Sequence, residues 1–150
     1  MPALPVFCRL LLTLSLFSGL ALSAEVQKPS LVIASSAESI VLRQGYSSNA
    51  VTVTVTELRK KLANEIALLE GHPWKQTTII KHGACGHQVE FITGGATVLH
   101  LYVYPSKVFL APRGTTRNPQ FVAQVVRTEL PTLRKLLLSL PPPSPCPDET

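Results

Sequence analysis

The chain has 150 residues, the length of a single domain, and carries 14 lysines and arginines against nine acidic residues. The net charge of +5 at pH 7 favours anionic partners, such as acidic proteins or anionic polymers of a cell envelope. The sequence contains no phosphate-binding glycine motif, no dinucleotide-binding motif and no paired zinc-type cysteines, so it does not predict a nucleotide enzyme or a zinc finger.

Residues 1–24 have the layout of a cleaved secretory signal. Arg9 is followed by a largely apolar run from Leu10 to Leu22 and then by small residues up to Ala24. This run is shorter than the roughly 18 apolar residues that a membrane-spanning helix needs. We therefore expect a periplasmic or secreted protein with no transmembrane helix in the mature chain and no nucleic-acid partner.

The mature chain divides into a single domain over residues 25–140 and a proline-rich tail over residues 141–150, which we expect to be extended. Two cysteines remain after the signal, Cys85 and Cys146. An exported protein with an even number of cysteines most often pairs them. The sequence therefore predicts a disulfide that ties the tail to the middle of the domain.

Short apolar runs predict strands over residues 31–35, 39–44 and 50–56, with the last two forming a hairpin. The third run alternates strictly between valine and threonine, which is typical of a half-buried strand. The period then changes, because apolar residues recur at helical spacing at Leu58, Leu62, Ile66 and Leu69. This spacing predicts a helix over residues 57–70, with Thr56 as its N-cap and Gly71 at its end.

Four further strands are predicted, at residues 76–82, 87–93, 96–104 and 107–111. Gly94-Gly95 is a two-residue hairpin turn, so we expect these strands to form an antiparallel meander. A second helix is expected from Asn118-Pro119 onward, interrupted at Pro131 and resumed up to residue 140. The predicted fold class is α+β, with a mostly antiparallel sheet made of an N-terminal hairpin and a four-stranded meander, and two helices packed on one face.

The hairpin register predicts a possible metal site. Counting back from Gly94-Gly95 places His87 opposite Tyr102, and a four-residue loop before His87 places His82 opposite it. One face of the sheet then carries His82, His87 and His100, a set that suits Zn or Cu. The alternative is that the three histidines are ordinary rim or core positions and that the protein has no cofactor.

Aromatic and basic residues gather near the end of the predicted meander, as is common in protein interaction surfaces. The candidate partner-binding residues are Tyr102, Tyr104, Lys107, Phe109, Arg113 and Arg117. The strands at residues 50–56 and 107–111 are candidates for accepting a partner's strand.

These features favour a non-enzymatic, exported accessory or binding protein of the cell envelope. It would engage another envelope or secreted protein, or an anionic envelope component. An exported Zn- or Cu-binding protein is the first alternative. A small secreted enzyme, with Cys85 as a thiol nucleophile, or an enzyme inhibitor is the second.

Overall fold

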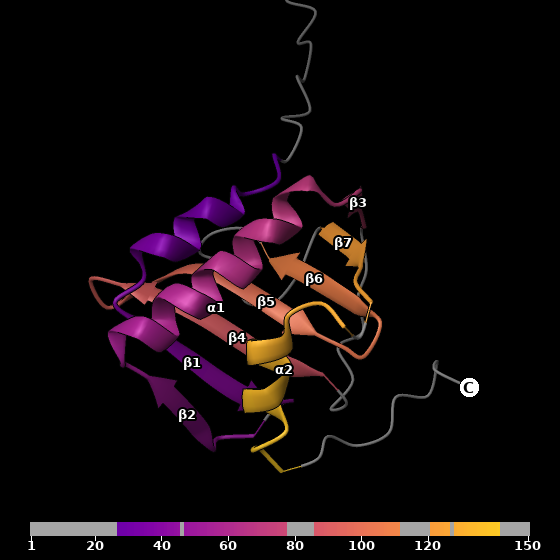
Figure 1. Ribbon diagram of the computed structural model, residues 1–150. Coiled ribbons are helices and arrows are strands. Elements are labelled where there is room, and N and C mark those ends of the chain that lie inside the picture. Colours follow the sequence, from indigo (N-terminus) through magenta and orange to yellow (C-terminus); the bar gives the residue numbers. More distant parts are fainter. Residues whose placement is uncertain (1–26, 46, 78–85, 112–120, 127, 142–150) are drawn as a thin grey trace, which may run out of the picture.

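A seven-stranded antiparallel sheet is the framework of the protein, with helices on one of its faces (Figure 1). The computed structural model describes residues 27–45, 47–77, 86–111, 121–126 and 128–141. The strand order across the sheet is β2-β1-β4-β5-β6-β7-β3. The strands are β1 (Ser39–Gln44), β2 (Ala50–Val53), β3 (Lys75–Gln76), β4 (His87–Thr93), β5 (Ala96–Val103), β6 (Lys107–Ala111) and β7 (Phe121–Gln124). The predicted α+β class with a mostly antiparallel sheet is confirmed.

The helical layer consists of α1 (Thr56–Leu68) and α2 (Pro131–Leu137), with two 3-10 segments, η1 (Leu31–Ser36) and η2 (Leu69–Gly71). Helix α1 crosses the middle of the sheet, η1 lies beside it, and α2 covers the end of the central strands (Figure 1). The first predicted helix is confirmed, although Val55 rather than Thr56 occupies its N-cap position.

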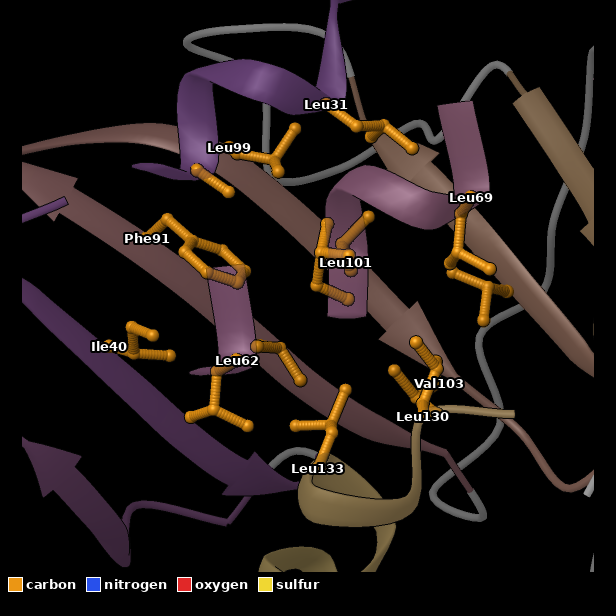
Figure 2. Close-up of a cluster of buried hydrophobic side chains, with 14 of the residues drawn as sticks. Leu31, Ile40, Leu62, Leu69, Phe91, Leu99, Leu101, Val103, Leu130 and Leu133 are labelled. Carbon is orange, nitrogen blue, oxygen red and sulfur yellow. The ribbon is translucent and has the colours of Figure 1, made fainter. Parts of the chain in front are cut away.

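The core lies between this helical layer and one face of the sheet. Figure 2 shows Ile40, Phe91 and Leu101 from the strands pointing toward Leu62 of α1 and Leu133 of α2. All five side chains are completely buried. Burying large apolar side chains of this kind contributes about 1.5–3 kcal/mol each, so this single core is the main source of stability.

Three predicted elements differ from the structure. Residues 31–35 form η1 and not a strand, because Leu31 and Ala34, three positions apart, are the buried pair. Residues 121–124 form β7 and not the start of a helix, because Phe121, Ala123 and Val125 are buried with a period of two. Helix α2 begins only at Pro131, whose fixed backbone angle suits a first helical position.

The meander is also assembled differently from the prediction. The β4-β5-β6 part is confirmed, and β1 pairs with β2 as expected. Strand β3, however, pairs with β7 at the far edge of the sheet, and β4 pairs instead with β1. The hairpin predicted between residues 76–82 and 87–93 is therefore wrong in its pairing, and residues 78–82 lie outside the described part of the chain.

The two-residue turn at Gly94-Gly95 is present, with backbone φ angles of 56° and 75°. Positive φ at both positions is what a tight hairpin turn requires and what glycine adopts without strain. Thr93 pairs with Ala96 as predicted. Beyond Ile92 the register shifts by one residue, so Phe91 pairs with Leu99 and Val98 has no partner on β4. Because of this bulge, every later residue of β5 pairs with a different residue of β4 than the sequence predicts.

Candidate functional site

The face of the sheet opposite the helices, called here the helix-free face, carries the charged side chains of the described strands. Successive residues of a strand point to opposite faces, so the register assigns each residue to one of them. No helix of the described residues lies on this face (Figure 1). The charged residues of the described strands all belong to it; they are Arg43, Lys75, Glu90 and Lys107.

An aromatic cluster occupies the β5-β6 half of the helix-free face. Tyr102 pairs with Phe109 across the two strands, which places both rings on this side of the sheet. The Phe109 ring meets the Tyr104 ring edge to face, with the ring centroids 5.3 Å apart. The Tyr102 ring stacks on His100 at 4.5 Å. Tyr102 is buried, whereas Tyr104 and Phe109 are partly exposed, so this pair is the accessible part of the cluster.

Tyr104 is positioned by its backbone and by a neighbouring glycine. Its N–H donates to the Lys107 carbonyl at 2.9 Å, which closes the turn between β5 and β6. Its own carbonyl accepts a bond of 3.4 Å from Nη1 of Arg134, on α2. A Cβ atom at Gly86 would stand only 2.7 Å from Cζ of the Tyr104 ring. Glycine at position 86 is thus what allows the ring to lie against the end of β4.

The charges on the helix-free face leave a positive excess beside the aromatic cluster. Arg43 and Glu90 lie 3.7 Å apart and partly neutralise each other. Lys75 and Lys107 form no ion pair with any described residue. Lys107 follows the turn beside the accessible aromatic rings, and Lys75 lies on the same face with Val122 between it and Phe109. Two lysines without ionic partners on this face favour a negatively charged partner.

Four of the six predicted partner-binding residues therefore come together on one face, and they are Tyr102, Tyr104, Lys107 and Phe109. Arg113 and Arg117 lie outside the described residues. Gly86 and Lys75 were not predicted as site residues. Nothing in the local sequence marks Lys75 as a site residue, because its place on the helix-free face depends on the long-range pairing of β3 with β7. Gly86 has a signal in hindsight, since it is a glycine directly before a strand, where close backbone approach is common.

The predicted histidine cluster is not assembled by the described strands. His87 pairs with Val103 and not with Tyr102, and His100 pairs with Glu90. His87 therefore belongs to the helix-covered face and His100 to the helix-free face. The physical reason is the bulge at Val98, which shifts β5 by one residue and so exchanges its two faces. His82 lies outside the described residues, and among those described no group of three potential ligands is close enough to hold a metal.

His87 has a distinct environment at the start of β4. Its Nε2 is buried and has no hydrogen-bond partner in the described part of the chain. Burial lowers the pKa of His87 below its ordinary value, because desolvation disfavours the charged ring. The side chain is thus a neutral imidazole at the margin of the core. The predicted disulfide cannot be placed in the same way, because Cys85 and Cys146 both lie outside the described residues.

Comparisons with protein-family models, with curated proteins and with solved structures yield no match to this chain. Within the described residues, no helix has the length and apolar character required to cross a membrane. Of the two strands predicted as possible edges, β6 lies inside the sheet between β5 and β7, whereas β2 is an edge strand.

Proposed function

We propose that the protein is a non-enzymatic binding protein that engages an acidic partner protein through the helix-free face of its sheet. The observation that carries this proposal is the edge-to-face contact between the Tyr104 and Phe109 rings, whose centroids lie 5.3 Å apart, on the same face as Lys107. Aromatic rings supply contact area at low entropic cost, and nearby cations supply orientation.

The proposed setting is the periplasm or the extracellular space. This part of the proposal is supported by residues 1–24, whose cation, apolar run and small residues have the layout of a secretory signal. In that setting the acidic partner is another envelope or secreted protein. An anionic envelope polymer or lipid surface would offer similar charge, and the tests below distinguish it from an acidic protein partner.

The first test is site-specific photo-crosslinking in the cells that make the full chain. A photoreactive amino acid at Phe109 is expected to give one discrete protein adduct. The same amino acid at Leu138, which is 85% exposed and follows α2 on the helix-covered side, is the control. Equal adducts from both positions, or no adduct from Phe109, would contradict the proposal.

The second test reverses charge. Lys75→Glu with Lys107→Glu is expected to lower the Phe109 adduct yield about tenfold, because opposite charges that guide association become like charges. Lys61→Glu with Lys135→Glu produces the same change in net charge on exposed helical positions and is expected to leave the yield unchanged. Binding of the wild type to anionic phospholipid vesicles, without any protein adduct, would favour the anionic surface instead.

A further inference from the structure

The two edges of the sheet differ in how well they are protected against pairing with a strand of another molecule. Strand β3 forms one edge with only two residues, one of which is Lys75. Strand β2 forms the other edge with four residues, all uncharged. Residues 44–56, which contain β2, include no charged residue and no proline. Proteins normally blunt an edge with lysine, proline or a very short strand, so β2 lacks the usual protection against pairing with another strand.

The backbone of β2 presents free pairing groups at this edge. Gly45 N–H donates to the Gly86 carbonyl at 2.7 Å, so the odd-numbered residues of β1 bond toward β4. In an antiparallel sheet the even-numbered residues of β1 then bond toward β2, where they face Val51 and Val53. By the same alternation, the N–H and C=O groups of Ala50 and Thr52 point away from the sheet. Both of these residues are exposed.

The carbonyl of Thr54, the next one along the chain that points away from the sheet, already accepts a hydrogen bond. Thr54 O accepts a hydrogen bond of 3.1 Å from Nε of Arg59. An added strand therefore finds its free partners at Ala50 and Thr52, on either side of Val51. Val51 itself is 41% exposed although its side chain belongs to the core-facing side of the sheet.

We propose that this edge binds the β2 edge of a second copy of the chain, antiparallel and with a two-fold axis at Val51. Ala50 of each copy then pairs with Thr52 of the other, so the four free groups of each edge are all satisfied. The two Val51 side chains meet across the axis and cover each other. The result is one continuous sheet built from both copies.

The occupant is a second copy because the segment is complementary to itself. Antiparallel pairing about Val51 sets Val51 against Val51 on one face and Ala50 against Thr52 on the other, and it brings Asn49 opposite Val53, so every residue of the contact is uncharged. Cross-strand pairs of β-branched residues stabilise sheets, and no like charges oppose each other. The axis is perpendicular to the sheet, so the helix-free faces of both copies lie on the same side.

The short contact predicts a weak dimer. Four residues per edge bury far less than the roughly 1,200 Å² at the low end of stable interfaces. We therefore expect a reversible monomer–dimer equilibrium, with a dissociation constant between about 10 μM and 1 mM. Sedimentation equilibrium of the purified mature chain measures this constant, using material that is monomeric on a denaturing gel without reductant so that disulfide-linked chains are absent.

Charge exchange at Thr52 tests the pairing. Thr52→Lys and Thr52→Glu each place like charges on the two copies as diagonal neighbours, and each variant alone is expected to dimerise at least about fivefold more weakly. An equal mixture of the two variants is expected to recover or exceed wild-type association. Gln76→Lys adds the same charge to the opposite edge, on β3, and is expected to leave dimerisation unchanged.

Three results would overturn the proposal. One is a wild type that stays monomeric up to about 1 mM. Another is a Thr52→Lys variant that dimerises as the wild type does, and the third is a mixture of the two Thr52 variants that fails to associate. Circular dichroism of each variant establishes that the exposed substitution leaves the fold intact, so a loss of association is attributable to the edge.

Discussion

The carboxylate of Glu65, on α1, accepts a hydrogen bond from the backbone N–H of Leu133, on α2, at 3.0 Å. Its other oxygen accepts the Thr132 N–H at 2.9 Å. The first N–H groups of a helix have no partner inside the helix, and a side chain at the N-cap position usually supplies one. Leu130 holds that position here and has no side-chain acceptor. Glu65, remote in sequence, therefore caps α2.

Replacing Glu65 with alanine is expected to destabilise the protein by about 1–3 kcal/mol, because a buried N–H of α2 loses its acceptor. Glu65→Gln keeps one acceptor oxygen, so its loss is expected to be smaller. Chemical denaturation of the two variants and the wild type gives the three free energies of unfolding. Equal stability of Glu65→Ala and the wild type would show that the cap contributes nothing.

Substitution of Gly86 is expected to disturb the aromatic cluster. The new Cβ of Gly86→Ala would stand 2.7 Å from the Tyr104 ring, so the ring must move or the variant loses about 1–3 kcal/mol of stability. Near-ultraviolet circular dichroism reports the ring's environment. Gly71→Ala is the matched control, since a Cβ there has nothing within 4 Å and no change is expected. If both variants give the wild-type spectrum and stability, Gly86 does not position Tyr104.

The buried imidazole of His87 makes stability depend on pH. Burial lowers its pKa in the folded state, while the unfolded chain keeps the ordinary value of about 6.5. Below about 6.5 the unfolded state therefore binds more protons than the folded state, and the free energy of unfolding falls as the pH is lowered toward the folded pKa. Above about 6.5 both states are neutral and this contribution is constant.

His87→Gln is expected to flatten this dependence between about pH 5.5 and 7.5, a window above the ordinary pKa range of carboxylates. Denaturation midpoints measured across the window compare the slopes of wild type and variant. Parallel slopes in the two proteins would assign the dependence to another group.

Glu70 fastens the segment before η1 to the end of α1. Its carboxylate accepts bonds of 2.6 Å from Lys28 Nζ and 2.5 Å from the Leu31 N–H. Burial on its own raises the pKa of Glu70, but these hydrogen bonds and the Lys28 charge outweigh it and hold the pKa below its ordinary value. The stabilisation is thus present above about pH 4.3, the usual pKa of an unfolded glutamate, and is lost as the pH falls through the folded pKa.

We expect Glu70→Gln to loosen this attachment locally, with little effect on global stability because the carboxylate is partly exposed. Hydrogen exchange at the Leu31 amide is the direct measurement, and it should be faster in the variant. Glu57→Gln, at an exposed position of α1, should leave that amide unchanged. Unaltered exchange at Leu31 in Glu70→Gln would argue against the attachment.

The sequence predicts those elements whose pattern is decided locally. The strand at residues 87–93 has the predicted bounds, and α1 follows the spacing of Leu62, Ile66 and Leu69. The gathering of Tyr102, Tyr104 and Phe109 was also predictable, because a tight turn joins β5 to β6. In these segments the same residues that set the local structure also face the core or the turn.

The predictions are wrong where the structure of a segment depends on pairing with a part of the chain that is distant in sequence. Val98 is the unpaired residue at the register shift between β4 and β5, and no residue of the local sequence marks that shift. Phe121 and Val122 fit an apolar helical stripe as well as a strand, and pairing with β6 selects the strand. Because the metal hypothesis depended on an unbroken register, one extra residue was enough to separate His87 from His100.

The position of β1 between β2 and β4 has a consequence for how the chain acquires its structure. Hairpin β1-β2 and helix α1 involve neighbours in sequence, and so do the turns between β4, β5 and β6. The β1-β4 ladder, which joins these two groups, pairs Gln44 with His87 and Ser39 with Ile92. Pairing across such a separation is slow, because loop-closure entropy is lost before the contacts form. During synthesis, the β1-β4 ladder therefore cannot be completed until residue 92 has been made. Until then, both edges of the N-terminal hairpin lack a partner strand: the outer edge of β2 and the edge of β1 that later pairs with β4.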